Sequence, residues 1–154
     1  MKKPYNNIIT HYEECLEKHG DTHLGVDWPK IEDVDKRYKV MLDIIKFDEL
    51  NLTTSKLLDF GCGTAHLLEY INKNQYSDIK YSGLDISQKF VDVAQNKFPD
   101  IDFYCSDILE NESSIPTFDY IVMNGVFTEK RELTFDQMWE YFTKLLTLVY
   151  EKSS

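Results

Sequence analysis

The sequence predicts an α/β fold with a mostly parallel sheet, and three features of its 154 residues support this prediction. From residue 56 onward, short apolar runs of strand length alternate with stretches of helical periodicity. Glycines and a proline separate these runs, as at Gly61, Gly63 and Pro99. Strands that alternate with helices pair in parallel through right-handed crossovers, so the pattern predicts a three-layer sandwich with helices on both faces of the sheet.

Two helices are predicted before the first strand. Apolar side chains recur at spacings of three and four between residues 6 and 19, and Gly20 is a typical C-terminal cap for such a helix. After a loop rich in turn residues, a second helix is predicted over residues 31–47. We therefore divide the chain into an N-terminal helical segment, residues 1–50, and an α/β domain, residues 51–154.

The α/β domain is predicted to hold four strands. In chain order, strands are expected at residues 56–61, 80–86, 101–107 and 118–125, with helices at 65–73, 87–97 and from about 134 onward. The apolar residues of the last helix recur at helical spacing and are expected to face inward: Phe135, Met138, Trp139, Phe142, Leu145, Leu146 and Val149.

The charge balance argues against a nucleic-acid partner. Lys and Arg number 17 against 27 Asp and Glu, which gives a formal net charge of −10 and a field that repels phosphate backbones. No run approaches the roughly 20 apolar residues of a membrane span. The first residues also lack the apolar core of a signal peptide. We expect a cytoplasmic protein that acts on a small molecule, without nucleic acid or membrane.

The cysteines and histidines show no metal-ligand spacing. The chain has three cysteines, Cys15, Cys62 and Cys105, an odd number that suits a reduced protein without disulfides. Cys62 is expected to be a small apolar filler. His11, His19 and His23 have no carboxylate or cysteine at a recognisable spacing, so no metal site is expected. These histidines are either exposed or capping residues, or one of them acts as a general base.

The strongest local signal is the segment Asp59-Phe60-Gly61-Cys62-Gly63-Thr64, where a buried strand leads through a glycine turn into a helix. Gly61 and Gly63 allow backbone angles and close ligand approach that a Cβ atom would block. A dinucleotide-binding loop would carry a third glycine at the position of His66, so the pyrophosphate fingerprint is incomplete. Asp59 suits a loop that faces an ammonium group; the alternative is a purely structural turn.

Polar residues follow at the ends of the later strands. Asp85 ends the second strand about 20 residues beyond the glycines, where an acid hydrogen-bonds ribose hydroxyls; the alternative is a cap on the helix that begins at Ser87. Asp107 ends the third strand and could accept from an adenine amino group, or be a simple turn residue. Asn124 ends the fourth. Ligands of open α/β sheets bind at these carboxyl ends.

Four segments in order, DFGCGT, GLDIS, CSDI and FDYIVMNGVF, resemble the successive motifs of class I S-adenosylmethionine-dependent methyltransferases of the small-molecule type. The resemblance covers residues 56 to about 130 and implies a Rossmann-like sheet of strand order 3-2-1-4, with the N-terminal helices as a cap over the cofactor. The cofactor-binding residues that it implies are Asp59, Gly61, Cys62, Gly63, Asp85, Ile86, Asp107, Ile108, Asn124 and Arg37.

The resemblance also implies a part for each segment. The glycine loop and Asp59 would hold the methionine part of the cofactor, and Asp85 the ribose. Asp107 and Ile108 would flank the adenine, and Asn124 would border the sulfonium. Arg37 would pair with the methionine carboxylate through two parallel hydrogen bonds of its guanidinium group.

Two departures from the family pattern matter. After the fourth strand the sequence reads Asn124-Gly125-Val126-Phe127, not the Asn/Asp-Pro-Pro-aromatic motif of many enzymes that methylate amide or base amino groups. The chain also stops after the helix that follows the fourth strand, so the fifth strand and the final antiparallel pair are missing and the family fold appears as truncated. Strand 118–124 then forms an edge, and we hypothesise that a homodimer or a C-terminal partner pairs there.

The function predicted from the sequence is therefore methyl transfer from S-adenosylmethionine to a small polar molecule, without a metal. One alternative is a non-catalytic S-adenosylmethionine-binding module or the N-terminal fragment of a methyltransferase. A third, an NAD-dependent oxidoreductase, is disfavoured by His66.

Overall fold

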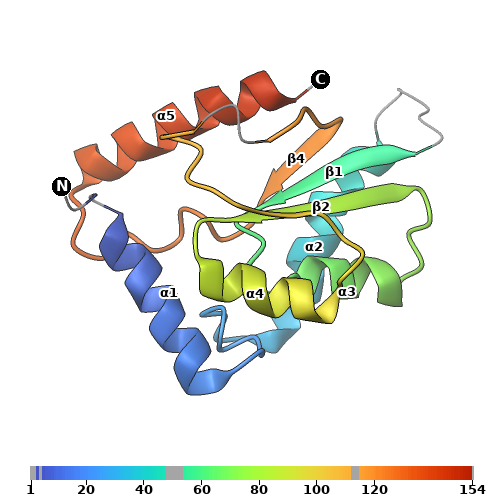
Figure 1. Cartoon of the computed structure of the whole chain (residues 1–154), viewed down its shortest axis with the longest axis horizontal. Helices are drawn as coiled ribbons and strands as arrows, with labels where there is room; N and C mark the ends of the chain where they lie inside the picture. The colour runs from blue at the N-terminus through green and yellow to red at the C-terminus, as the bar shows by residue number, and fades with distance from the viewer. Residues whose placement is uncertain (1–2, 4, 48–53, 112–114, 154) are drawn as a thin grey trace.

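The computed structural model describes residues 3, 5–47, 54–111 and 115–153 (Figure 1). Its elements in chain order are α1 (Asn6–His19), α2 (Ile31–Lys46), β1 (Ser55–Phe60), α3 (His66–Lys73), β2 (Ile79–Asp85), α4 (Gln88–Lys97), β3 (Phe103–Cys105), β4 (Tyr120–Met123) and α5 (Phe135–Lys152). The order of helices and strands is the predicted one. The third and fourth strands are shorter than expected.

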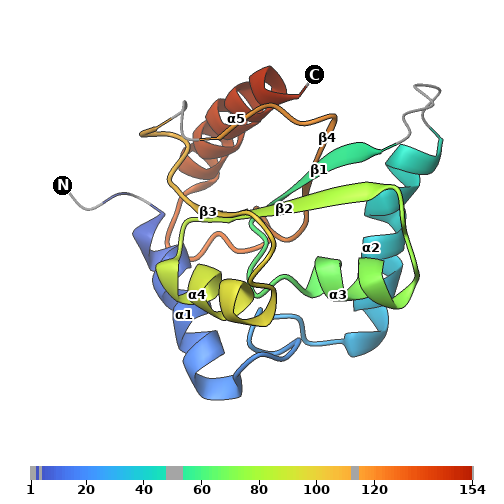
Figure 2. The ribbon, with the colours of Figure 1, turned by 45° about the vertical axis from the view of Figure 1, so that its right-hand side comes forward.

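The four strands form one parallel sheet of order β3-β2-β1-β4, which confirms the predicted Rossmann-like topology. Helices α2, α3 and α4 cover one face of the sheet and α5 covers the other (Figures 1 and 2). Alternate residues of β1 enter the two resulting cores, because successive strand side chains point to opposite faces. Leu57 packs with Leu42 and Leu67 on the α2–α3 side, whereas Leu58 packs with Leu145 of α5.

The two N-terminal helices take different positions. Helix α2 joins the main core, since Tyr38 and Leu42 are buried in the same cluster as Leu57. Helix α1 lies across the end of the molecule at which the strands terminate (Figures 1 and 2). It is fastened to α4, where Ser87 Oγ donates to Glu13 Oε1 at 2.6 Å. The predicted domain boundary at residues 50–51 lies outside the described residues.

The last helix departs from its prediction. Its start is confirmed, because Thr134 and Gln137 form a reciprocal capping box. Leu145 and Val149 are buried as expected, but the predicted inward set also contains residues that are exposed: Phe135, Trp139 and Leu146. In the described part of the chain the sheet ends at β4, so it covers only one stripe of α5.

None of the helices in the described residues is both long enough and apolar enough to span a bilayer.

Candidate functional site

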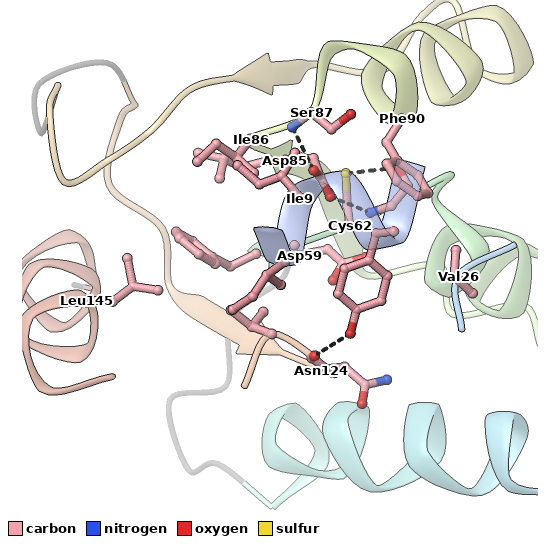
Figure 3. Close-up of a pocket in the computed structure, with 18 of the residues that line it drawn as sticks. Ile9, Val26, Asp59, Cys62, Asp85, Ile86, Ser87, Phe90, Asn124 and Leu145 are labelled. Atoms are coloured by element: carbon pink, nitrogen blue, oxygen red, sulfur yellow. Dashed lines mark hydrogen bonds between the residues drawn. The ribbon is translucent and has the colours of Figure 1, made fainter. Parts of the chain in front are cut away.

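The carboxyl ends of the strands open into one pocket, which α1 and the loop after it cover (Figure 3). Its lining comes from distant parts of the chain: α1 and the residue before it, Val26, Trp28, Tyr38, the glycine loop 59–63, residues 84–87, 106–109 and 124–126, and α5. The predicted convergence of the strand ends is therefore confirmed. This edge is where open α/β sheets bind their ligands.

All of the predicted site residues except Arg37 line this pocket: Asp59, Gly61, Cys62, Gly63, Asp85, Ile86, Asp107, Ile108 and Asn124. Their contact with a cofactor stays a prediction.

The glycine turn after β1 depends on its two glycines. Gly61 has a φ of +76° and Gly63 a φ of +54°, both in the left-handed region that favours glycine. A Cβ atom on Gly61 would also lie 2.7 Å from the Val126 side chain. The turn can thus approach the segment after β4 closely only because residue 61 lacks a side chain.

The backbone amides of this turn already donate hydrogen bonds within the protein. Gly61 N and Cys62 N both donate to the carbonyl oxygen of Leu84, at 2.8 and 2.9 Å. Gly63 N donates to Asp85 Oδ2 at 3.0 Å. A pyrophosphate-binding loop needs such amides free for the anion, so this arrangement fits poorly with a dinucleotide and agrees with the incomplete fingerprint.

Asp85 stands at the centre of the pocket wall (Figure 3). Its Oδ1 accepts from Ser87 N at 2.9 Å, and its Oδ2 from Gly63 N. Burial raises the pKa of Asp85, and these backbone hydrogen bonds oppose that rise. Each carboxylate oxygen can accept a further hydrogen bond, so Asp85 can stabilise the turn into α4 and bind ligand hydroxyls at the same time.

Asp59 is 4% exposed and accepts a hydrogen bond from Tyr81 Oη at 2.8 Å. Burial raises the pKa of Asp59 to about 7, although the Tyr81 hydrogen bond favours the charged form. The negative charge of Asp85 adds to the increase. An ammonium group nearby would restore the ionised form, because an opposite charge favours a carboxylate.

Asp107 is held by the beginning of the chain. Its Oδ2 accepts from Lys3 Nζ at 2.6 Å and from Tyr5 Oη at 2.5 Å, and its Oδ1 accepts from Leu109 N at 3.2 Å. Lys3 also pairs with Glu110. Asp107 lines the pocket as predicted, but one of its oxygens fastens the start of α1 to the end of β3.

Asn124 carries an unpaired buried donor. Among the residues that the structure describes, its Nδ2 is the one buried side-chain nitrogen or oxygen without a hydrogen-bond partner. Leaving such a group unsatisfied costs about 1–3 kcal/mol. Asn124 lines the pocket at the end of β4 (Figure 3).

The sequence profile of a family described as a methyltransferase domain matches residues 58–148, more than half of the chain. The chain belongs to this family. A relative from Rickettsia prowazekii (strain Madrid E), an uncharacterized protein, is 30% identical over 101 residues, which cover 62% of this chain and 40% of the relative. The chain thus spans less than half the length of that relative.

Solved structures share the fold of this methyltransferase domain. Magnesium protoporphyrin IX methyltransferase (ChlM) from Synechocystis PCC 6803, with bound SAM, has a TM-score of 0.67 at 16% identity over 100% of this chain and 74% of that one. The plantazolicin methyltransferase BpumL, in complex with a desmethylPZN analog and SAH, has a TM-score of 0.60 at 20% identity over 100% of this chain and 58% of that one.

Arg37 of the methyltransferase domain does not line the pocket. It is exposed, and its guanidinium carbon lies 4.6 Å from the centroid of the Trp28 ring. The next residue, Tyr38, does line the pocket. Because successive helical residues point about 100° apart, Arg37 faces away when Tyr38 faces in. The geometry gives no support to the expected pairing of Arg37 with a cofactor carboxylate.

An aromatic cover completes the pocket of the methyltransferase domain. Tyr12, Trp28 and Tyr38 line it from α1, the following loop and α2, and Tyr12 Oη donates to the carbonyl oxygen of Gly125 at 3.4 Å. Such ring faces attract cations. The sequence predicted no site role for three further lining residues, Val26, Phe90 and Tyr141. Their residue types are equally typical of a core, so no signal in the sequence distinguishes them.

Proposed function

We propose that this methyltransferase domain binds S-adenosylmethionine in the pocket at the strand ends and transfers its methyl group to a small polar molecule. Membership of the family, the sheet order and the position of the pocket support the proposal. The strongest single observation is that Asp85, from the end of β2, and Asn124, from the end of β4, line one pocket beneath an aromatic cover.

The residues present fit such a ligand. Asp85 would accept from the ribose hydroxyls, and Asp59 would balance the ammonium of the methionine part, beside glycines whose missing side chains leave room. Asp107 and Ile108 would flank the adenine. Asn124 would border the sulfonium.

The cofactor supplies an electrophilic methyl group on a cationic sulfonium, so the main task of the protein is to position a nucleophile in line with it. Tyr12 and Trp28 line the pocket, and aromatic rings favour a nearby cation. A general base is optional, because an amine or an ionised oxygen attacks without help.

Isothermal titration with S-adenosylmethionine, S-adenosylhomocysteine and NAD tests the ligand class. We expect both adenosyl ligands to bind one per chain and NAD to bind weakly or not at all, since the turn amides are occupied. Preferential binding of NAD would contradict the proposal.

Variants then test the site. Asp85→Ala is expected to weaken S-adenosylhomocysteine binding at least about tenfold, because it removes charge-assisted hydrogen bonds worth about 1.5–3 kcal/mol. Gly61→Val should abolish binding by filling the turn. Asp92→Ala, on the exposed side of α4, is the matched control and should bind like the parent protein. Circular dichroism checks that each variant is folded.

A second candidate is S-adenosylmethionine binding without turnover, as a module or fragment of a longer enzyme. It is favoured by the observation that the chain spans 40% of its Rickettsia relative. Release of S-adenosylhomocysteine from S-adenosylmethionine, measured with a panel of small polar metabolites, separates the two candidates. Saturable, substrate-dependent release supports catalysis, whereas tight binding with no release across the panel supports the module.

We also propose a reducing, cytoplasmic compartment for the protein, because all three cysteines are free thiols.

A further inference from the structure

Three potential metal ligands meet at the junction of α1 and the loop that follows it. They are His11, Cys15 and Asp27, and one ligand atom from each lies within 4.8 Å of the other two. His11 Nε2 is 2.8 Å from Asp27 Oδ2, and Cys15 Sγ is 3.8 Å from His11 Nε2. All three residues are partly buried, so their side chains are held by the surrounding structure and yet remain accessible to solvent.

The fold explains why the three groups meet. His11 and Cys15 are four residues apart on α1, so their side chains share one face of the helix. Asp27 is brought back to this face by a closed loop, in which Asp27 N donates to Leu24 O at 3.1 Å and Trp28 N to His23 O at 2.7 Å. The φ of Asp27 is +58°, unusual for a residue with a side chain.

We propose that His11, Cys15 and Asp27 bind a zinc ion with a fourth coordination position left open. One imidazole, one thiolate and one carboxylate form a mixed ligand set that suits Zn²⁺ and not the hard cations Mg²⁺ and Ca²⁺. Three protein ligands and one exchangeable position are also typical of zinc sites that are open to small molecules.

The distances are close to those that zinc requires. Tetrahedral zinc with ordinary bond lengths places its nitrogen, oxygen and sulfur ligands roughly 3.4–3.6 Å apart. The sulfur–nitrogen distance of 3.8 Å nearly satisfies this. The His11–Asp27 distance of 2.8 Å is that of a hydrogen bond, and it opens by about half an ångström when the ion replaces the shared proton.

The surroundings give the ion a path from solvent. A shallow surface hollow reaches His11 and is lined also by Asn7, Thr10, Glu14, Arg131 and Glu132. The two carboxylates in this hollow offset the charge of Arg131 and favour the approach of a cation.

The site borders the pocket without belonging to it. Tyr12 follows His11 in the chain, and Val26 and Trp28 flank Asp27; these three neighbours line the pocket, whereas His11, Cys15 and Asp27 do not. A bound ion would clamp α1 to the loop and fix the aromatic cover in place. This inference goes beyond the proposed function and does not depend on it.

Titration of the chelator-treated full chain with Zn²⁺ and with Co²⁺ tests the proposal. We expect one ion per chain, a higher melting temperature with Zn²⁺, and a thiolate-to-cobalt charge-transfer band in the near ultraviolet. Cys15→Ser and Asp27→Asn should each weaken binding by more than the roughly 10–100-fold that loss of an outer-sphere partner costs. Cys15→Ser should also remove the band.

Two matched variants serve as controls. Cys105→Ser removes an exposed thiol elsewhere, and His19→Gln removes a histidine of the same helix outside the cluster; both should bind like the parent protein. The proposal is overturned if folded parent protein binds no stoichiometric Zn²⁺, or if Cys15→Ser and Asp27→Asn bind as tightly as the controls. Binding of S-adenosylhomocysteine, measured separately, reports on the proposed function alone.

Discussion

At the scale of single residues, Asp59 lowers the stability of the ligand-free protein at neutral and higher pH. Its carboxyl group is buried at the end of β1, with Tyr81 as its hydrogen-bond donor, and burial raises its pKa from 3.8 to about 7. Between these two values the folded protein keeps a proton that the unfolded chain releases, so stability falls as the pH rises across this window. Above pH 7 the whole penalty is present.

We predict that Asp59→Asn stabilises the ligand-free protein at about pH 8 and much less at about pH 4, since the amide keeps an acceptor for Tyr81 and carries no charge. Each unit of pKa shift corresponds to about 1.4 kcal/mol, so the gain is on the order of a few kcal/mol. Denaturant unfolding at both pH values measures it. Asp92→Asn, on the surface of α4, should show no such pH-dependent gain; an equal gain in both variants would contradict the account.

The residues of the site differ in how far the sequence could predict them. Asp59, Asp85 and Asn124 were predictable because each ends a strand, and strand ends meet at one edge of a parallel sheet. The partners of Asp107 were not, since Lys3 and Tyr5 lie about a hundred residues away and no local pattern links them. The approach of Asp27 to His11 and Cys15 was missed for the same reason, because it depends on the path of a loop, whereas the four-residue spacing of His11 and Cys15 was a local pattern that went unrecognised.

At the scale of elements, α1 is held over the pocket by its two ends. Tyr5 stacks on Tyr141 with ring centroids 5.1 Å apart and donates to Asp107, while Glu13 and Glu17 pair with Lys89 of α4. The ion pairs of Lys89 are exposed and contribute little. The buried end at Tyr5 therefore contributes more to the attachment than these ion pairs.

We predict that Tyr5→Phe lowers the free energy of unfolding by about 1–3 kcal/mol, because it removes a hydrogen bond to a carboxylate and keeps the ring packing. Hydrogen exchange should become faster in residues 6–19, because local opening of α1 breaks the same hydrogen bond. Tyr150→Phe, at a ring that is 77% exposed, is the control and should change neither quantity. Unchanged exchange in α1 of Tyr5→Phe would show that the helix is held in another way.

Helix α5 shows what the periodicity of apolar residues can and cannot predict. The spacing of its apolar residues predicted one inward-facing stripe, and the capping box fixed its start. Periodicity shows which face is apolar but does not show how much of that face another element covers. In the structure Phe135 and Trp139 stack on each other at the surface, with ring centroids 6.4 Å apart.

At the scale of the whole molecule, the sheet order was predictable because it follows from chain connectivity and family resemblance. Whether the chain pairs with a second copy depends on surfaces built from several segments. Two residues before β4, the outer side of the chain is already paired with the chain's own last residues, through a parallel bridge between Phe118 and Ser153 in which Phe118 N donates to Lys152 O at 2.9 Å. The outer side of β4 itself pairs with no strand among the described residues. Edge strands with apolar neighbours favour pairing with another chain. Pairing of a second copy at this edge stays a prediction.

We predict that the chain self-associates at micromolar concentration through β4 and the exposed face of α5. Sedimentation velocity should show a concentration-dependent dimer, and Trp139→Glu should shift it toward monomer because a charge replaces an exposed apolar ring. Lys144→Gln, on the polar side of the same helix, changes the net charge by the same single unit and controls for charge alone. A parent protein that sediments as a monomer and melts cooperatively would contradict this prediction.

The central claim, that four strand ends form one adenosyl-binding site, is tested most directly by NMR titration of isotope-labelled protein with S-adenosylhomocysteine. We predict saturable shifts of the backbone amides in residues 61–63, 85–87, 106–109 and 124–126, with small changes in α3 and in the C-terminal half of α5. Saturable shifts in only one of these segments, or shifts centred elsewhere, would contradict the claim.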